Sequence, residues 1–444
     1  MASTRAPITD PPSGTQPETR SEGSSRWYVL GLLTVVSLFS IADRLVFSIL
    51  IEDIKAEFAL NDFEVGLLGG LAFALTYVIA GFPAARLADR SVRKNIVAGA
   101  ITFWSVMTAV CGAATGFWTL FLARTGVGVG EGCSGPASQS LVADLFRREE
   151  LAKAMGFLSI GATLGTVTGL MAGGLLSEAF GWRWAFVLMG LPGVLIGAIV
   201  YLTVREPVRG RFAPKGARIE QQSVGETARA LLGNRVFLGL AIGWAVQIMI
   251  GYALAVWMAP VMMRGFGMGP GDVGLYLGLA FLIGGIPGPI LGGIVTGWLA
   301  KRDERWRAWV PGLVSFGCLA PLAISLTATS FWPFLSWFAL AYGIFVMSQA
   351  GILSGIQSSV EPGQRGFAVA IALFFNNLIG QAFGVPLIGW VSDGLAVTYG
   401  EAALTYAVFG VCLGAGILTL VIFAWTAAQM SRTGYLDRMA QTPA

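Results

Sequence analysis

The sequence predicts an all-α integral membrane protein with twelve transmembrane helices. Of its 444 residues, 55% are apolar and only 12% carry a charge, and the mean hydropathy is +0.70. A soluble domain carries about 25% charged residues. Apolar runs of about 20 residues, the length that crosses roughly 30 Å of hydrocarbon, recur along the chain. Because backbone groups in lipid must be satisfied within each segment, these runs are expected to be helices.

The twelve predicted spans follow one another with short polar connections. They lie near residues 27–51, 64–86, 95–115, 117–140, 153–177, 183–204, 236–263, 271–300, 308–328, 331–357, 367–392 and 401–427. The longest polar loop, 205–235, is basic and separates the sixth span from the seventh. It divides the chain into two predicted six-helix bundles, residues 27–204 and 236–427. Residues 1–26 are polar and proline-rich and are expected to be disordered, and residues 428–444 form a carboxy-terminal tail.

Basic residues in the loops predict the orientation in the membrane. Of the 29 Lys and Arg residues, the loops on one side hold only Lys55, Arg183 and Arg264, while Arg44 and Arg124 lie inside spans. The remainder share the side of both termini. Cytoplasmic loops carry the excess of Lys and Arg, so both termini are expected in the cytoplasm. The sequence thus predicts a multi-pass protein of the plasma membrane, which in a bacterium is the inner membrane.

Four charges interrupt two apolar runs at membrane depth. Asp43 and Arg44 lie in the first span, and Arg124 and Glu131 in the fourth. A charge at this depth is expensive, so it usually faces a partner or a transport pathway. The chain has no histidine, so a proton relay would depend on the two carboxylates.

The spacing of these charges suggests how they pair. Adjacent helical residues point about 100° apart, so Asp43 and Arg44 cannot face one neighbour equally. We expect Arg44 to pair with Glu131 across helices one and four. Asp43 is then expected near a cavity, where burial and the neighbouring arginine oppose each other in setting its protonation. The alternative is that all four charges form a static ion-pair network. Arg124 shares the helix face of Glu131 two turns away, and its partner stays open.

The two halves of the chain repeat two motifs. Leu87-Ala88-Asp89-Arg90 corresponds to Leu299-Ala300-Lys301-Arg302, and Gly165-x-x-x-Gly169 corresponds to Gly380-x-x-x-Gly384. The two copies of each motif are separated by nearly the same number of residues. Duplicated halves with a binding site between them are a known plan of secondary transporters.

The segment ARLADRSVRK (85–94) resembles the loop signature of the major facilitator superfamily. Asp89, Arg90 and Arg93 match the signature, whereas Ala85 and Val92 replace its two glycines. The resemblance implies a cytoplasmic gate formed by these residues together with Lys301 and Arg302 of the second half. The simpler reading is that they supply cytoplasmic positive charge. The glycines of the fifth span resemble the antiporter motif of the superfamily, with Leu170 in place of its proline. Close helix packing explains them at least equally well.

The segment GVGVGEGCSGPASQSLVADLF (126–146), together with FSIADR in the first span, resembles the Spinster-like branch of this superfamily. The resemblance implies two six-helix bundles that alternate in access. It also implies that Asp43, Arg44 and Glu131 form the polar centre of the first bundle. Eukaryotic members of the branch move lysolipids.

The second half offers uncharged polar and aromatic residues as candidate lining of the substrate cavity. The amides are equally suited to bonds between helices, and each aromatic to ordinary packing. The candidates are Gln247, Tyr252, Trp257, Ser348, Gln349, Asn376 and Asn377. Pro287, Pro289 and Pro386 are expected to bend or soften helices eight and eleven.

These observations predict a secondary transporter with an amphipathic lipid-like cargo, and they assign proton coupling to Asp43 and Glu131. The alternatives are a proton-coupled carrier of a small organic anion or drug, and a membrane receptor or scaffold that transports nothing. No Gly-x4-Gly-Lys-(Ser/Thr) motif is present, so ATP is not the expected energy source. No enzyme activity, metal, cofactor or nucleic-acid partner is expected. The expected partners are the cargo, protons and membrane lipids, and the expected state is a monomer.

Overall fold

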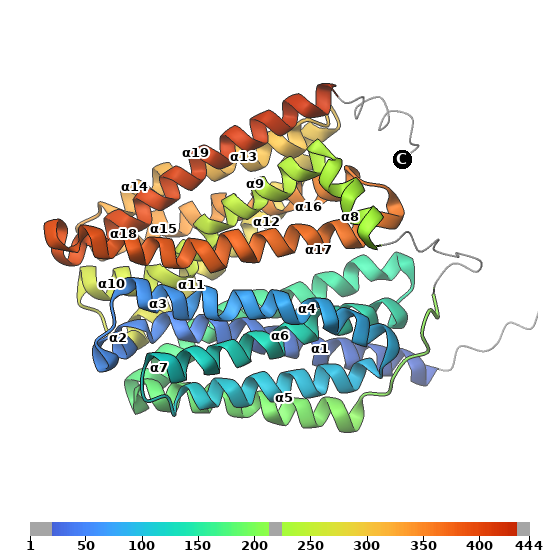
Figure 1. Cartoon of the computed structure of the whole chain (residues 1–444), viewed down its shortest axis with the longest axis horizontal. Coiled ribbons are helices and arrows are strands. Elements are labelled where there is room, and N and C mark those ends of the chain that lie inside the picture. The colour runs from blue at the N-terminus through green and yellow to red at the C-terminus, as the bar shows by residue number, and fades with distance from the viewer. Residues whose placement is uncertain (1–19, 213–223, 433–444) are drawn as a thin grey trace, which may run out of the picture.

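A computed structural model describes residues 20–212 and 224–432, and these form two helical bundles that lie side by side (Figure 1). The first bundle consists of α1 (Arg20–Ile49), α2 (Ile51–Phe58), α3 (Asp62–Gly69), α4 (Leu71–Arg90), α5 (Arg93–Cys111), α6 (Phe117–Leu145) and α7 (Arg148–Thr203). A short helix, α8 (Val224–Gly233), follows in the connection between the bundles.

The second bundle contains more breaks. Its elements are α9 (Arg235–Tyr252), η1 (Ala253–Trp257), α10 (Met258–Phe266), α11 (Pro270–Gly285), α12 (Pro287–Ala300), α13 (Trp306–Gly317), α14 (Leu319–Leu326), α15 (Phe331–Val346), α16 (Ser348–Ser358), η2 (Pro362–Gln364), α17 (Arg365–Phe375), η3 (Asn376–Phe383), α18 (Gly384–Tyr399), η4 (Gly400–Ala402) and α19 (Ala403–Arg432). The segments η1 and η3 are π-helical, and η2 and η4 are 3-10 turns.

The described residues contain nine helical segments long and apolar enough to span a membrane. Two of the nine, Glu149–Thr203 and Arg365–Ser431, turn back on themselves and each supply two crossings. The first turns at Gly181, whose φ of 80° suits a glycine, and the second at η4. Helix α6 is a further crossing whose glycines and charges lower its hydropathy. The twelve predicted crossings are therefore present in the part of the chain that the structure describes.

The predicted segment boundaries need two adjustments. Helix α1 begins at Arg20, so the end of the segment 1–26 is helical; residues 1–19 lie outside the described residues. Helix α19 likewise extends to Arg432, into the predicted tail. The predicted loop 205–235 contains the short helix α8 near its end. Helix eight breaks between α11 and α12 at Pro287, as its prolines predict, because proline lacks the N–H that would continue the helix.

The glycines of α7 serve helix packing. Four of them, spaced four residues apart, lie against four residues of α1 with the same spacing: Gly161, Gly165, Gly169 and Gly173 against Thr34, Leu38, Ala42 and Val46. At three of these positions the nearest neighbour is a backbone carbonyl, so a side chain has no room. This spacing lets the two helix backbones approach closely, and it holds α1, the helix of Asp43 and Arg44, in a fixed position.

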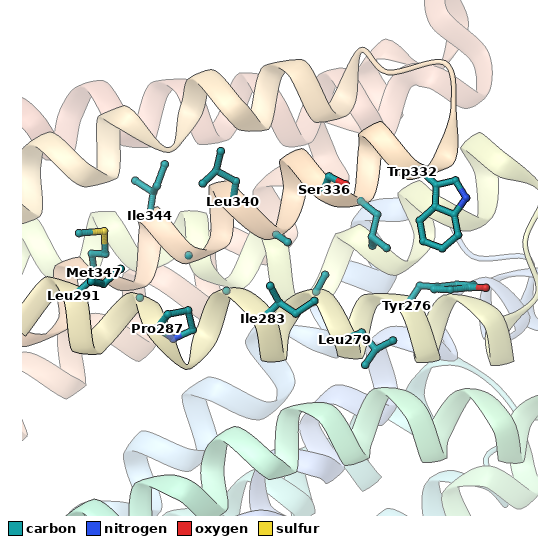
Figure 2. Close-up of a pocket in the computed structure, with 16 residues that line it drawn as sticks. Tyr276, Leu279, Ile283, Pro287, Leu291, Trp332, Ser336, Leu340, Ile344 and Met347 are labelled. Atoms are coloured by element: carbon teal, nitrogen blue, oxygen red, sulfur yellow. The ribbon is translucent and has the colours of Figure 1, made fainter.

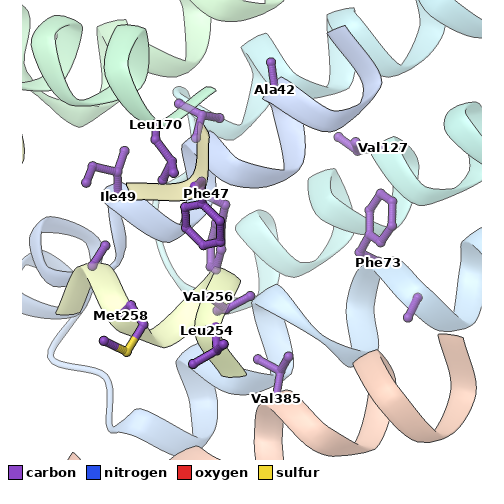
Figure 3. Close-up of a cluster of buried hydrophobic side chains, with 14 of the residues drawn as sticks. Ala42, Phe47, Ile49, Phe73, Val127, Leu170, Leu254, Val256, Met258 and Val385 are labelled. Atoms are coloured by element: carbon purple, nitrogen blue, oxygen red, sulfur yellow. The ribbon is translucent and has the colours of Figure 1, made fainter. Parts of the chain in front are cut away.

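The two bundles meet at one end only. We call this the α2 end, and the opposite end, which carries α8, the α8 end (Figure 1). One apolar cluster includes residues of both bundles, among them Phe47, Phe73, Leu170, Val256 and Val385 (Figure 3). A second cluster, around Phe237, Ile356 and Phe423, belongs to the second bundle alone. Among the described residues, α12, α16 and α17 make no extended contact with the first bundle.

The packing of α7 on α1 generates a test. Gly165→Val places methyl groups against the Leu38 carbonyl, and overpacking of this kind costs about 1–3 kcal/mol. The melting temperature in detergent is expected to fall. Gly156→Val is the matched control, because a Cβ at Gly156 meets no atom within 4 Å. Equal melting temperatures for the two variants would contradict the assignment of Gly165 to packing.

Candidate functional site

The polar centre of the first bundle is an ion pair between Arg44 of α1 and Glu131 of α6. Arg44 Nε donates to Glu131 Oε2 at 2.8 Å, and Nη2 lies 2.7 Å from the same oxygen. Ser40, one turn earlier in α1, donates to this oxygen at 2.6 Å. The predicted pair is therefore present. The Glu131 side chain is fully buried, whereas Arg44 keeps 15% of its side chain exposed, so Arg44 is the member that a ligand can reach.

Aromatic rings surround the Arg44 guanidinium. Its Cζ lies 4.5 Å from the Phe73 ring centroid and 4.8 Å from that of Tyr77, both in α4. Tyr252, at the end of α9 in the second bundle, interacts with Arg44 electrostatically. A cation over aromatic faces is stabilised by the ring quadrupoles. Arg44 thus lies between the bundles with an acid on one side and rings on the others. The sequence analysis did not identify Ser40, Phe73 or Tyr77.

The position of Asp43 differs from the expectation that it lies near a cavity. Its side chain is fully buried and points toward α5, where Thr108 Oγ1 donates to Oδ2 at 3.3 Å. Oδ1 has no hydrogen-bond partner among the described residues. The reason is geometric: α1 turns about 100° between Asp43 and Arg44, and the neighbour in the Asp43 direction is another helix of the same bundle.

Arg124 of α6 is also buried, and it binds backbone instead of an acid. Its Nε and Nη1 lie 3.5 Å from the carbonyl oxygens of Leu68 and Asp43, respectively. Its guanidinium lies 4.7 Å from the Phe47 ring centroid. In the described part of the chain no carboxylate lies within ion-pair distance of Arg124, although Asp43 is close enough to interact with it electrostatically. Four charges therefore share one small volume, and only two of them are directly paired.

The candidate residues of the second bundle divide between packing and the bundle interface. Gln247 Nε2 donates to Ser348 Oγ at 2.9 Å inside the second bundle, and Trp257 Nε1 donates to the Val385 carbonyl at 3.2 Å. Asn377 bonds the Leu373 carbonyl of its own helix. Trp257 is fully buried. Asn376 is buried and Gln349 is half-buried, and no contact of either decides its role.

The two π-helical segments flank the interface between the bundles. Segment η1 packs against α1, and η3 packs against α4. Gln381 in η3 donates from Nε2 to the Gly69 carbonyl at 3.3 Å, across the interface, and its Oε1 lacks a partner among the described residues. π-helical turns occur frequently at functional sites. Gln381 was missed because sequence spacing does not reveal where a helix widens.

The bundles are joined at the α2 end by a charged network that the sequence analysis did not foresee. Arg264 of α10 binds Glu52 and Asp62 of the first bundle, each at 2.7 Å. Lys55 binds the same Asp62 at 2.5 Å. Across the interface, Ser392 of α18 donates to Asp62 Oδ2 at 2.7 Å.

The next residue of α18 completes this join. The Asp393 carboxylate accepts from the backbone N–H groups of Asp62 and Phe63 at 3.0 and 2.8 Å. An acid from the second bundle therefore satisfies free N–H groups at the start of α3, where a negative charge is also favoured by the helix dipole. The α2 end is closed by charge and backbone bonds as well as by apolar packing.

The residues expected to form a gate lie at the α8 end, and those whose side chains the structure describes do not bridge the bundles. Arg90, Lys301 and Arg302 are exposed, and Arg302 lies over Trp298 of its own bundle at 4.1 Å. The side chain of Asp89 lies outside what the structure describes. Arg93 has a different role from the expected one: it is buried and binds Asp144 at 2.5 Å and Glu206 at 2.7 Å. Asp144 belongs to α6 and Glu206 to the connecting loop, because α5 begins beside the end of α6 and the start of that loop.

A small pocket lies between the bundles beside the polar centre. Its volume is about 180 Å³, and its lining comes from α1, α7, α11 and α15. Ile41 lines it and lies three residues before Arg44, so the two share one face of α1. Thr163 and Thr166 give the pocket some polarity, and Phe281 and Tyr342 close its other side. In the residues described, no group of three or more His, Cys, Asp or Glu could hold a metal ion.

Comparison with known proteins gives consistent matches over most of the chain. A sequence model of the Major Facilitator Superfamily matches residues 32–385. An MFS-type efflux pump of Mycolicibacterium smegmatis (strain ATCC 700084 / mc(2)155) is 32% identical over 411 residues, covering 93% of this chain and 94% of the relative. The sphingosine-1-phosphate transporter SPNS2 of Danio rerio is 24% identical over 391 residues, covering 84% and 77%.

A solved structure shares the fold. It is the crystal structure of a bacterial homolog to the human lysosomal transporter Spinster, in an inward-facing and unoccupied conformation. It superimposes with a TM-score of 0.80 at 26% identity, covering 95% of this chain and 99% of that one.

The network at the α2 end generates a second test. Arg264→Gln leaves Asp62 and Glu52 without their shared cation, and breaking a buried ion pair in this way costs up to about 3–5 kcal/mol. The bundles are expected to separate more often at the α2 end. Spin labels on α2 and α18 measure this as a longer distance distribution. Arg183→Gln is the control, because Arg183 pairs with Glu57 at the same end but within the first bundle. An unchanged distribution in Arg264→Gln would show that the network does not hold the bundles together.

Proposed function

Because this chain belongs to the major facilitator superfamily, its Spinster-like branch, and is a transporter of that fold, we propose that it moves an anionic amphiphile by proton-coupled alternating access. The observation that carries the proposal is the position of Arg44. It is the partly exposed member of a buried ion pair, it faces the second bundle, and aromatic rings surround it. The substrate class is a lysolipid or sphingolipid with one charged head and one apolar chain.

Each part of such a substrate has a matching surface. A phosphate or carboxylate head would bind the accessible side of the Arg44 guanidinium, whose fork of N–H donors suits these anions. The start of the apolar chain would lie in the pocket beside Ile41, between Phe281 and Tyr342. The relative that transports sphingosine 1-phosphate supports this class. A small organic anion would bind Arg44 alone. Binding measurements with a panel of substrates would distinguish this alternative from a lipid-like substrate.

Charge balance offers a mechanism for proton coupling. With Asp43 ionised, the four buried charges sum to zero. With Asp43 protonated, one positive charge is uncompensated, and an anionic head placed near Arg44 would balance it. A buried carboxylate without a direct cationic partner is costly, whereas the neutral acid is not. Protonation of Asp43 and binding of an anion therefore favour each other. Glu131 is already paired with Arg44. Its proposed part in the same proton relay is to release Arg44 from this ion pair.

The conformation fits the same mechanism. The excess of basic residues in its loops predicts that the α8 end faces the cytoplasm. Closure at the α2 end would then make this an inward-facing state, like that of the homolog described above. Opening to the other side would require Arg264 to leave Asp62 and Glu52, and would bring the α8 ends together. We propose that Asp89, Arg90, Lys301 and Arg302 form the cytoplasmic gate in that second state. A ligand or proton shifts this equilibrium only by its different affinity for the two states.

The Arg44–Glu131 pair can be tested with neutral replacements. Arg44→Gln alone leaves Glu131 unpaired and should lower the melting temperature. The double variant Arg44→Gln with Glu131→Gln removes both charges, and replacement of a complete buried pair is often nearly neutral for stability. It is expected to regain stability yet bind a single-chain lysophosphatidic acid at least roughly tenfold more weakly, a loss of about 1.4 kcal/mol. Thermal-shift titration measures both quantities. A stable double variant with wild-type affinity would exclude Arg44 as the anion site.

Coupling to Asp43 makes a separate prediction. Wild-type affinity for the same lysolipid is expected to fall as the pH rises, because ionisation of Asp43 removes the uncompensated positive charge. Asp43→Asn resembles the protonated acid, so its affinity should keep only the pH dependence that comes from titration of the lipid phosphate, whose second pKa is about 6. Its substrate-driven proton flux in proteoliposomes should be absent. Asp53→Asn is the control, since Asp53 lies in α2 and bonds Ser177. A wild-type pH profile in Asp43→Asn would rule out this role. Substrate flux in wild-type liposomes also separates a transporter from a receptor or scaffold.

A further inference from the structure

A second cavity lies away from the polar centre. It is an apolar groove of about 640 Å³ between the helix pair α11 and α12 and the helix α15. Figure 2 shows its side chains placed along both walls, from Tyr276 and Trp332 at one end to Leu291 and Met347 at the other. Pockets for small molecules have volumes of roughly 300–1,000 Å³, so the groove is large enough for a ligand.

The floor and the walls of the groove differ in residue size. Small residues face each other along the floor, including Gly284 opposite Ala339 and Gly343. Larger residues rise on either side, and several are exposed: Ile283 is 65% exposed and Leu340 is 48% exposed. Both walls lie within spans of the membrane, Pro270–Ala300 and Phe331–Ser358. The groove thus lies at membrane depth, and its exposed apolar walls suit hydrocarbon better than water.

Polarity changes along the groove in one direction. The residues with polar groups, Tyr276, Trp332 and Ser336, lie toward its α2 end, where Tyr276 and Trp332 form an edge-to-face pair with ring centroids 5.6 Å apart. Trp and Tyr favour the level of the lipid headgroups. From there to Leu291 and Met347 the lining is apolar, over about 15 residues of helix, or roughly 22 Å at 1.5 Å per residue. This gradient matches an amphiphile with a polar head and a long chain.

We propose that this groove binds one acyl chain of a membrane amphiphile, whose headgroup lies beside Tyr276 and Trp332 at the α2 end. Inside a bilayer the groove is not in contact with water, so burying its apolar lining under an acyl chain gains little hydrophobic free energy. Selectivity for the chain must therefore come from shape complementarity. The small residues of the floor let the two helix backbones pack closely. The groove is therefore narrow at its base and bounded by the larger side chains of its walls, a shape that suits a single linear chain. The site is separate from the polar centre and does not depend on the proposed transport mechanism.

Photolabelling tests the site with a stated probe. The full chain is reconstituted in phosphatidylcholine nanodiscs that contain lysophosphatidylcholine with a diazirine in its acyl chain, and labelled peptides are mapped after irradiation. Labels are expected to concentrate on residues 276–291 and 332–347. Unlabelled lysophosphatidylcholine should reduce this labelling in a saturable way. Bulk lipid contact would give even labelling of all exposed spans without saturation, which would overturn the proposal.

Two variants fill the groove from opposite walls. Ser336→Phe and Ile283→Trp alter exposed residues, so folding should be retained, and melting temperatures check this. Each is expected to reduce labelling of the groove at least fivefold. Gly414→Leu enlarges an exposed position of α19 away from the groove and should leave labelling unchanged. Undiminished labelling in both filled variants, or crosslinks between the α15 helices of two copies, would contradict a lipid site.

Discussion

Neutralisation of charge inside the membrane is the constraint on which this structure depends. The Arg44–Glu131 pair joins α1 to α6 and fixes which face of α1 looks toward the second bundle. Asp43 is thereby directed into the first bundle, where Thr108 is its hydrogen-bond partner. The glycines of α7 hold α1 in the same orientation by close contact with its backbone. One ion pair and one packing seam thus determine the geometry of the polar centre.

The charges at the two ends of the molecule are paired in different ways. At the α2 end, charges cross between the bundles, and α3 and α18 share backbone bonds. At the α8 end, Arg93 binds Asp144 of its own bundle and Glu206 of the connecting loop. Opening one end therefore requires ion pairs to break, while closing the other requires new ones. The cost at each end sets how much free energy a substrate and a proton must supply.

Sequence reasoning identified the features that follow from the cost of polar groups in lipid. The spans, the two halves and the Arg44–Glu131 pair all derive from it. The surroundings of the Asp43 side chain could not be predicted. Adjacent side chains point in different directions around a helix, and which helix lies on the Asp43 side depends on how the bundle packs. The network at the α2 end could have been inferred from the distribution of basic residues in the sequence. Lys55, Arg183 and Arg264 are the basic residues on the side that should carry few, and each of them binds an acid. The π-helical segments and the groove of α11 and α15 left no such pattern.

The central claim is that proton binding and substrate binding at the polar centre favour each other. By linkage, an anion whose affinity rises with protonation must itself cause proton uptake when it binds. Calorimetric titration of the wild-type protein with lysophosphatidic acid, in two buffers of different ionisation enthalpy, measures this uptake directly. The account predicts uptake approaching one proton per substrate at a pH where Asp43 is ionised in the free protein. Saturable binding with no proton uptake at any pH between 5 and 9 would contradict it.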